Sequence, residues 1–271
     1  MGRWGLYWGK LEAMRIEKIA VQMYTLRECV RTASGFIEAC RRIAEIGYRA
    51  VQLSGVGAMD SELDAATARR ILDDHGLRVI ATHRPWDSLR NGTAFEVDFH
   101  QTLGCDYAAI GGLPSGYSQD AEGYRKFIVD AASVMNALAS QGIRFGFHNH
   151  SHEFQKSGEG QKTLYDILVE EAPRTLMLEV DTHWVAHAGA SPAALLRRCA
   201  GRIPVVHVKD TEVVAGLGPI MCPVGEGNLD WPAIIAECEA GGTESYAVEQ
   251  DDCRRDTFDC LRSSFKFLAA S

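Results

Sequence analysis

The 271-residue chain is 46% hydrophobic and 24% charged, a composition that supports a sizeable core and excludes a disordered protein. Its net charge of −8 argues against a nucleic-acid-binding protein, which usually carries a basic face. No apolar run approaches the roughly 20 residues of a membrane helix, so we expect no membrane partner.

The residues before Met14 carry charges but no continuous apolar stretch, so we expect no signal peptide. We interpret residues 1–15 as an N-terminal extension and residues 16–271 as one domain, because no linker or composition break divides that range. Met14 is an alternative functional start, and the sequence leaves this open. The eight cysteines form no C-x-x-C pair, and we expect them to be reduced thiols in a cytoplasmic protein.

Short β-branched runs alternate with amphipathic segments throughout the domain. The runs predicted to be strands are 18–24, 50–54, 78–83, 107–112, 144–150, 176–181, 204–210 and 246–251. The segments predicted to be helices are 35–47, 61–76, 94–104, 121–142, 162–172, 191–201, 231–242 and 256–269. Ser191 and Pro192 are typical of an N-cap followed by proline at the first helical position.

Eight strand–helix units with continuously apolar strands predict a parallel sheet covered by helices. In about 250 residues the economical arrangement is a single closed (β/α)8 TIM barrel. A doubly wound open sheet is the alternative, but it more often carries a glycine-rich phosphate loop after its first strand, where this chain reads "MYTLRE".

The ends of the later predicted strands collect imidazoles and carboxylates. In a barrel these ends form the active-site face, and residues two apart on a strand point the same way. The pairs that share a face in this manner are His148 with His150, Glu179 with Asp181, His207 with Lys209, and Glu249 with Asp251.

A single histidine at a strand end is usually a hydrogen-bonding residue, and a single aspartate before a helix is usually a cap. Acidic and imidazole groups on four consecutive strands are harder to explain in this way, because like charges forced together raise each other's pKa. A divalent cation removes that conflict, and the mixed donor set suits Mn²⁺, Mg²⁺, Co²⁺ or Zn²⁺. The pattern therefore predicts a metal site.

Five segments together resemble the xylose-isomerase-like TIM barrels, the family of sugar phosphate isomerases and epimerases. They are "FHNHSHEF", "EVDTHWVAHAG", "PVVHVKD", "PVGEGNLDW" and "YAVEQD", and the first strand, "KIAVQMYTLRE", is similar as well. The resemblance runs from about Lys18 to Leu268 and is specific for the superfamily, but weak on substrate.

The resemblance implies one divalent ion bound by residues of strands five to eight, and we expect this ion to be Mn²⁺. Asp181, His207 and Glu249 match three family ligands. The fifth-strand glutamate of many members is replaced here by His148. We expect Glu153 to supply the missing carboxylate and His148 to act as a base. The opposite assignment, with His148 as the ligand and Glu153 outside the ligand set, stays open.

Trp184 stands where the family's epimerases often carry a substrate-binding histidine, so that contact is not transferred to this chain. The related apurinic endonucleases need the same histidine for further zinc ions, which argues against DNA repair. We expect a set of other side chains to contact a small carbohydrate substrate: His83, Arg84, His150, His183 and Trp184. The alternative for Trp184 is core packing.

The resemblance implies an isomerase or epimerase that acts on a keto-sugar through an enediolate intermediate. We expect His148 and Glu249 to move protons and Lys209 to stabilise the enediolate oxygen, although Lys209 in an ion pair with Glu179 or Asp251 is the alternative. A lyase, hydrolase or dehydratase acting on a 3-keto-glycoside or keto-inositol stays open, as does association into a homo-oligomer. Residues 212–229 are expected to form a glycine-rich lid over the site.

Overall fold

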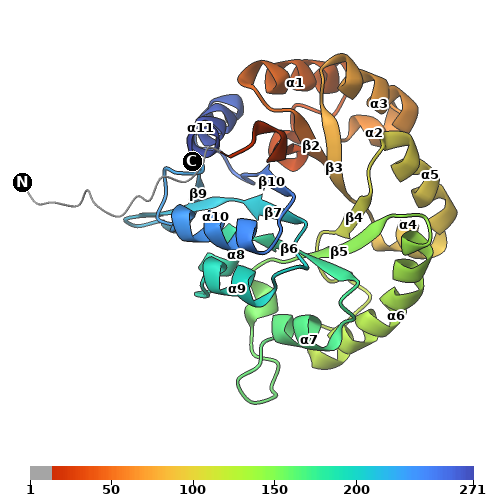
Figure 1. Ribbon diagram of the computed structural model, residues 1–271, viewed down its shortest axis with the longest axis vertical. Helices are drawn as coiled ribbons and strands as arrows, with labels where there is room; N and C mark the ends of the chain where they lie inside the picture. Colours follow the sequence, from red (N-terminus) through yellow and green to blue (C-terminus); the bar gives the residue numbers. More distant parts are fainter. Residues whose placement is uncertain (1–13) are drawn as a thin grey trace, which may run out of the picture.

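The structure is a computed structural model that describes residues 14–271. Eight parallel strands close into a barrel surrounded by helices, which confirms the predicted (β/α)8 architecture (Figure 1). Most of the expected N-terminal extension lies outside the described residues. Within residues 14–271, no helix has both the length and the apolar character needed to cross a membrane.

The barrel strands follow the predicted runs closely. They are β1 (Ile19–Gln22), β2 (Ala50–Leu53), β3 (Arg78–His83), β4 (Tyr107–Ile110), β5 (Arg144–His148), β6 (Leu176–Asp181), β7 (Val205–Val208) and β10 (Ser245–Val248). Each strand pairs with the next, and β10 closes the barrel against β1. The register sets His148 opposite Glu179 and Asp181 opposite His207, so the polar strand ends lie at one level.

The helices form the outer layer. They are α1 (Ala33–Ile46), α2 (Ala58–Ser61), α3 (Ala65–Asp74), α4 (Trp86–Asn91), α5 (Thr93–Leu103), α6 (Ala121–Ala139), α7 (Leu164–Glu171), α8 (Thr182–His187), α9 (Pro192–Arg198), α10 (Trp231–Ala240) and α11 (Thr257–Ala270). Three 3-10 turns are added, η1 (Ile16–Lys18), η2 (Met23–Leu26) and η3 (His152–Phe154). The Ser191 hydroxyl accepts a hydrogen bond from the Ala194 amide, which confirms the predicted cap of α9.

The inside of the barrel below the site is filled by small and aromatic side chains. Ala20, Ala50, Ala109 and Ala247 are fully buried there with Tyr107. A Cβ atom on Gly146 of β5 would lie 2.0 Å from the Tyr107 hydroxyl, so this strand needs a glycine to accommodate the ring. This plug closes the barrel, and the polar side chains above it form its open end.

Two segments differ from the predicted elements. The helix expected at 61–76 begins later, as α3 at Ala65, because Asp64 caps it by accepting a hydrogen bond from the Thr67 amide. The glycine-rich segment after β7 contains an antiparallel hairpin of β8 (Asp210–Val214) and β9 (Gly218–Cys222). The short helices α2, α4 and α8 were not predicted.

Candidate metal centre and active site

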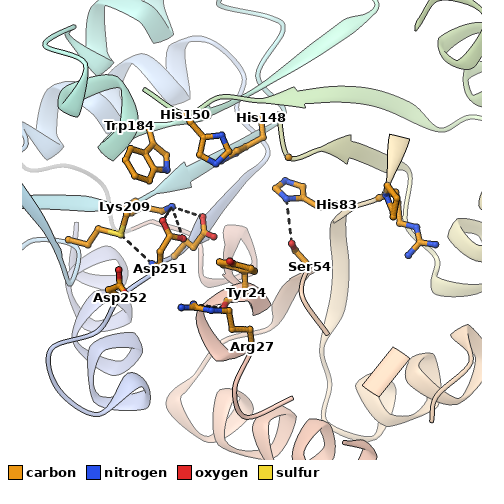
Figure 2. Close-up of a pocket in the computed structure, with 15 residues that line it drawn as sticks. Tyr24, Arg27, Ser54, His83, His148, His150, Trp184, Lys209, Asp251 and Asp252 are labelled. Carbon is orange, nitrogen blue, oxygen red and sulfur yellow. Dashed lines mark hydrogen bonds and ion pairs between the residues drawn. The ribbon is translucent and has the colours of Figure 1, made fainter. Parts of the chain in front are cut away.

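A cavity of about 690 Å³ opens at the carboxyl ends of the strands. Its lining residues come from both halves of the barrel, and they include Tyr24, Arg27, Ser54, His83, Arg84, His148, His150, Trp184, Lys209, Met221, Glu249 and Asp251. Figure 2 shows His148, His150 and Trp184 on one wall and Tyr24, Arg27 and Ser54 on the opposite one, with Lys209 and Asp251 between them.

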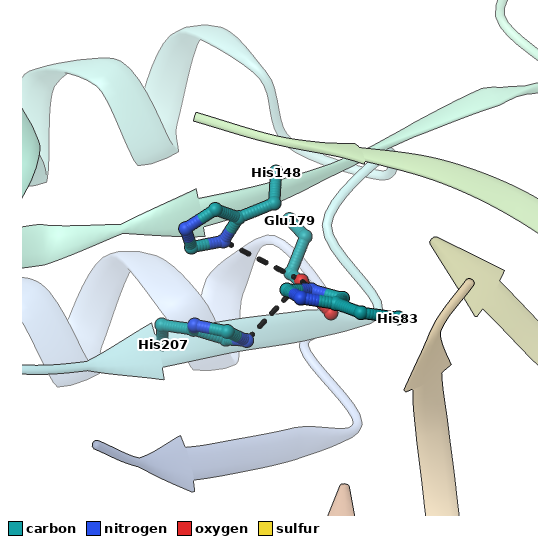
Figure 3. Close-up of side chains that lie close together, drawn as sticks. All are labelled: His83, His148, Glu179 and His207. Atoms are coloured by element: carbon teal, nitrogen blue, oxygen red, sulfur yellow. Dashed lines mark hydrogen bonds and ion pairs between the residues drawn. The ribbon is translucent and has the colours of Figure 1, made fainter. Parts of the chain in front are cut away.

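Glu179 of β6 organises the deeper layer of the site (Figure 3). Its Oε2 atom is hydrogen-bonded to Nε2 of His83. The same oxygen lies 3.2 Å from Nε2 of His207 and 3.5 Å from Nδ1 of His148. The Gln52 amide donates to Oε1 at 2.9 Å. Burial would raise the pKa of Glu179, but His207 and His83 outweigh it and hold this pKa well below its usual range.

Asp181, His207 and Glu249 form the upper layer. Nδ1 of His207 lies 2.8 Å from Oε2 of Glu249 and 4.0 Å from Oδ2 of Asp181. The ammonium of Lys209 lies 3.0 Å from both of these carboxylate oxygens and 3.1 Å from Asp251. The protein thus places a buried cation of its own among the acidic groups.

The pKa values of this layer follow from these neighbours. Burial would lower the pKa of His207, but Glu179 and Glu249 raise it to about 10. Burial would likewise lower the pKa of Lys209, but Asp181, Glu249 and Asp251 raise it above its usual range. Burial raises the pKa of Asp181 to about 6, against the effect of Lys209.

The residues of the upper layer fit a divalent ion. Asp181 is fully buried, and its Oδ2 atom faces the Lys209 ammonium at 3.0 Å, so an ion bound here would share this carboxylate with Lys209. One donor atom each from Asp181, His207 and Glu249 lies within 4.8 Å of the other two. Two carboxylates and an imidazole are a donor set that transition metals accept, with positions left open for substrate. The chain therefore has a possible metal site here.

Glu153 does not lie in this group. It belongs to η3 and forms a separate cluster with His150 and His152. His148, in contrast, reaches between the two layers, with its Nε2 atom 3.9 Å from Oδ2 of Asp181. The structure thus brings together three of the four expected ligands.

His148 is a buried and uncharged imidazole. Burial, followed by the nearby His207, holds its pKa well below the usual range. Its Nδ1 atom has no hydrogen-bond partner among the described residues, although Glu179 is close by. A neutral ring on the cavity wall can accept a proton, and Glu179 is placed to stabilise the imidazolium that forms.

The expected substrate contacts divide into two sets. His83, His150 and Trp184 line the cavity, and Lys209 lies 5.6 Å from the centroid of the Trp184 ring. Arg84 also reaches the cavity, but its guanidinium is bound by the buried Glu96 at 2.7 and 2.9 Å.

His183 packs behind the cavity wall. It is almost fully buried, and its Nδ1 atom lies 2.6 Å from the Thr211 hydroxyl of β8. His183 is not among the described residues that line the cavity.

The segment expected to act as a lid is held at its base by Asp210. Its Oδ2 atom accepts hydrogen bonds from the backbone amides of Gly225 and Gly227 and from the Trp231 indole, at 2.9, 3.1 and 2.7 Å. A Cβ atom on Gly227 would lie 2.4 Å from Asp210, so this turn requires glycine. Met221 of β9 reaches the cavity, which gives the hairpin one wall of the site.

Sequence reasoning missed several members of the site. Glu179 was considered only as an ion-pair partner of Lys209, although its spacing from Asp181 already placed both on one face. Gln52 hydrogen-bonds both Glu179 and His207, and its position at a strand end was the available signal. Met221 belongs to the segment that was expected to form a lid, but it was not singled out, and no sequence pattern pointed to Arg27 after β1.

Comparison with known proteins identifies the family. The model of the xylose isomerase-like TIM barrel matches residues 40–249. The chain belongs to this family. It is 25% identical over 257 residues to the rhizopine catabolism protein MocC of Rhizobium meliloti, with 79% of this chain and 75% of that protein covered.

Solved structures share the fold. A sugar phosphate isomerase/epimerase from Parabacteroides distasonis superposes with a TM-score of 0.77 at 19% identity, over 96% of each chain. The IOLI protein, whose structure contains a bound zinc atom, superposes with a TM-score of 0.67 at 14% identity, over 92% of this chain and 95% of that one.

Proposed function

We propose that this protein is a divalent-metal-dependent isomerase or epimerase that acts on a keto-sugar through an enediolate. One observation carries the proposal: the donor atoms of Asp181, His207 and Glu249 converge beside the cavity that Glu249 lines together with the neutral imidazole of His148. The family and an isomerase/epimerase of the same fold support this reaction class.

Asp181, His207 and Glu249 would hold the ion, which we expect to be Mn²⁺, with Mg²⁺, Co²⁺ or Zn²⁺ as alternatives. When bound, such an ion acts as a Lewis acid that polarises a substrate carbonyl. The bound zinc of the IOLI protein supports a divalent ion on this fold. Burial would raise the pKa of Glu249, but Lys209 and His207 hold it well below its usual range, which suits a ligand better than a proton donor.

His148 would remove the proton from the carbon next to the carbonyl. Its ring is neutral before the reaction, and Oε2 of Glu179 lies 3.5 Å from its Nδ1 atom, ready to pair with the imidazolium. Lys209 stays protonated, so its ammonium would stabilise the negative oxygen of the enediolate. Trp184 and Met221 would shield the reacting carbons from water.

Deuterium exchange tests this reaction. The protein with Mn²⁺ is incubated with a panel of free ketoses in D₂O, and Asp181→Asn serves as the matched control. We expect deuterium at the carbon next to the carbonyl with the sugar skeleton retained, and no exchange with the control.

Elimination from a 3-keto-glycoside or keto-inositol is the second candidate, because the same base and oxyanion contacts serve it. The similarity to a rhizopine catabolism protein favours testing it. Release of an aglycone or of water, without exchange on free ketoses, would establish this candidate in place of the first.

A further inference from the structure

A second group of metal-binding side chains lies in the turn after β5, apart from the centre described above. It consists of His150, His152 and Glu153, and one donor atom from each lies within 4.8 Å of the other two. No ligand of the upper layer belongs to it, so it can be occupied independently.

Two buried atoms in this group lack full partners. Glu153 is fully buried, and the His150 amide fixes its Oε2 atom with a hydrogen bond of 2.8 Å. The Nδ1 atom of His150 has no hydrogen-bond partner within the part of the chain that the structure describes, and the Oε1 atom of Glu153 has only the half-exposed His152 imidazole close by. Buried polar atoms that lack full partners cost free energy, so this pair calls for a ligand.

Both atoms border the same small space beside Gly112. A Cβ atom built on this glycine would lie 3.5 Å from Nδ1 of His150 and 3.8 Å from Oε1 of Glu153. The Nε2 atom of His152 approaches the same Glu153 oxygen to 3.2 Å from the solvent side, where its side chain is 50% exposed. The three groups therefore lie around one position, and the half-exposed His152 links it to the surface.

We propose that His150, His152 and Glu153 bind a second divalent cation of the zinc type. Two imidazoles and one carboxylate form a three-ligand zinc set with a position left for water. The ion would also orient the His150 ring, which stands between His148 and Trp184 on the cavity wall (Figure 2). This site does not depend on the proposed reaction.

Zinc stoichiometry tests the proposal. The protein is stripped of metal and titrated with Zn²⁺ against a chromophoric chelator, alongside His152→Ala, Glu153→Gln, Asp181→Asn and the double variant His152→Ala/Asp181→Asn. His75→Ala removes a histidine at the outer end of α3 and controls for zinc on surface imidazoles. His152 is half exposed, so its replacement should leave the fold intact, which the melting temperature without metal checks.

We expect two equivalents for the wild type and for His75→Ala, one for His152→Ala and for Asp181→Asn, and none for the double variant. Loss of a ligand should weaken the second equivalent by at least about 100-fold, since even outer partners of a metal ligand contribute 10- to 100-fold. Unchanged stoichiometry in His152→Ala and Glu153→Gln would overturn the second site. One ion that only His152→Ala removes would instead support this site and contradict the metal centre of the proposed function.

Discussion

The two carboxylates of β6 stand two residues apart on one face of the same strand, yet their surroundings are opposite. Glu179 is surrounded by three imidazoles and an amide donor, and its pKa is well below the usual range. Asp181 faces Glu249 and the Lys209 ammonium, which lies 3.0 Å from its Oδ2 atom, and burial raises its pKa to about 6. Strand periodicity brings both groups to the barrel axis, whereas the neighbouring strands decide that one carboxylate orients imidazoles and the other faces a cation.

The largest effect should come from His148, which lies between the two layers. We expect His148→Ala to lower turnover by on the order of 10²–10⁴, the usual contribution of a positioned base, and to leave bound Mn²⁺ unchanged. Metal content is measured before rates, with His75→Ala as the control. If His148→Ala empties the metal centre, His148 is a ligand and the base must be sought elsewhere, first at His83.

Glu179, at the centre of the deeper layer, should contribute to the stability of the fold. Glu179→Gln removes one of the two anions that compensate the buried His207 imidazolium, so the free energy of unfolding should fall by about 3 kcal/mol, with Glu249 still in place. Urea unfolding measures this, and Glu17→Gln, at an exposed carboxylate, is the control with little expected change. A loss below about 1 kcal/mol would show that Glu179 does not hold the imidazoles together.

Metal binding by the upper layer should depend on pH. His207 has a pKa of about 10, so below this pH an ion that binds Nδ1 must displace a proton. The affinity for Mn²⁺ should therefore rise about tenfold per pH unit from pH 7 to 9, and more steeply below pH 6, where Asp181 is protonated too. Calorimetry in buffers of different ionisation enthalpy counts the released protons. A flat affinity over this range would exclude His207 as a ligand.

The smallest effect should follow from Glu153. Because it shares no ligand with the upper layer, Glu153→Gln should leave Mn²⁺ affinity at the Asp181 centre within about twofold. Equilibrium dialysis with Mn²⁺ measures both Glu153→Gln and Asp181→Asn, and the loss expected for Asp181→Asn is the positive control. A loss of Mn²⁺ in Glu153→Gln would show that Glu153 is a ligand of this centre, as expected from the sequence.

Regular periodicity explains what the sequence predicted well. The alternation in "LMLEVD" and "PVVHVKD" places Asp181 and His207 at the open end of adjacent strands, and the barrel register sets them opposite each other. The eight strands were found for the same reason. Periodicity thus predicts that Asp181, His207 and Glu249 lie at one end of the barrel, and the resemblance to the family singled them out as ligands.

Irregular backbone explains what could not be predicted. The turn after β5 folds into η3, which carries Glu153 toward His150 and away from Asp181. The direction of a side chain in such a turn cannot be predicted from the two-residue periodicity of a strand. The pairing of Arg84 with Glu96 joins the end of β3 to α5, a contact set by helix packing. The hairpin after β7 was missed because its glycines were interpreted as part of a lid loop, although "DTEVV" ends in two β-branched residues.

The most direct test of the central claim is Mn²⁺ binding by the wild type and by Asp181→Asn, both in the His152→Ala background, which isolates the Asp181 centre. Equilibrium dialysis should find about one Mn²⁺ per chain, and its addition should raise the melting temperature because only the native state binds it. Asp181→Asn should lose both the bound ion and the shift in melting temperature. Equal Mn²⁺ content and an equal shift in the two proteins would contradict a metal centre built on Asp181, His207 and Glu249.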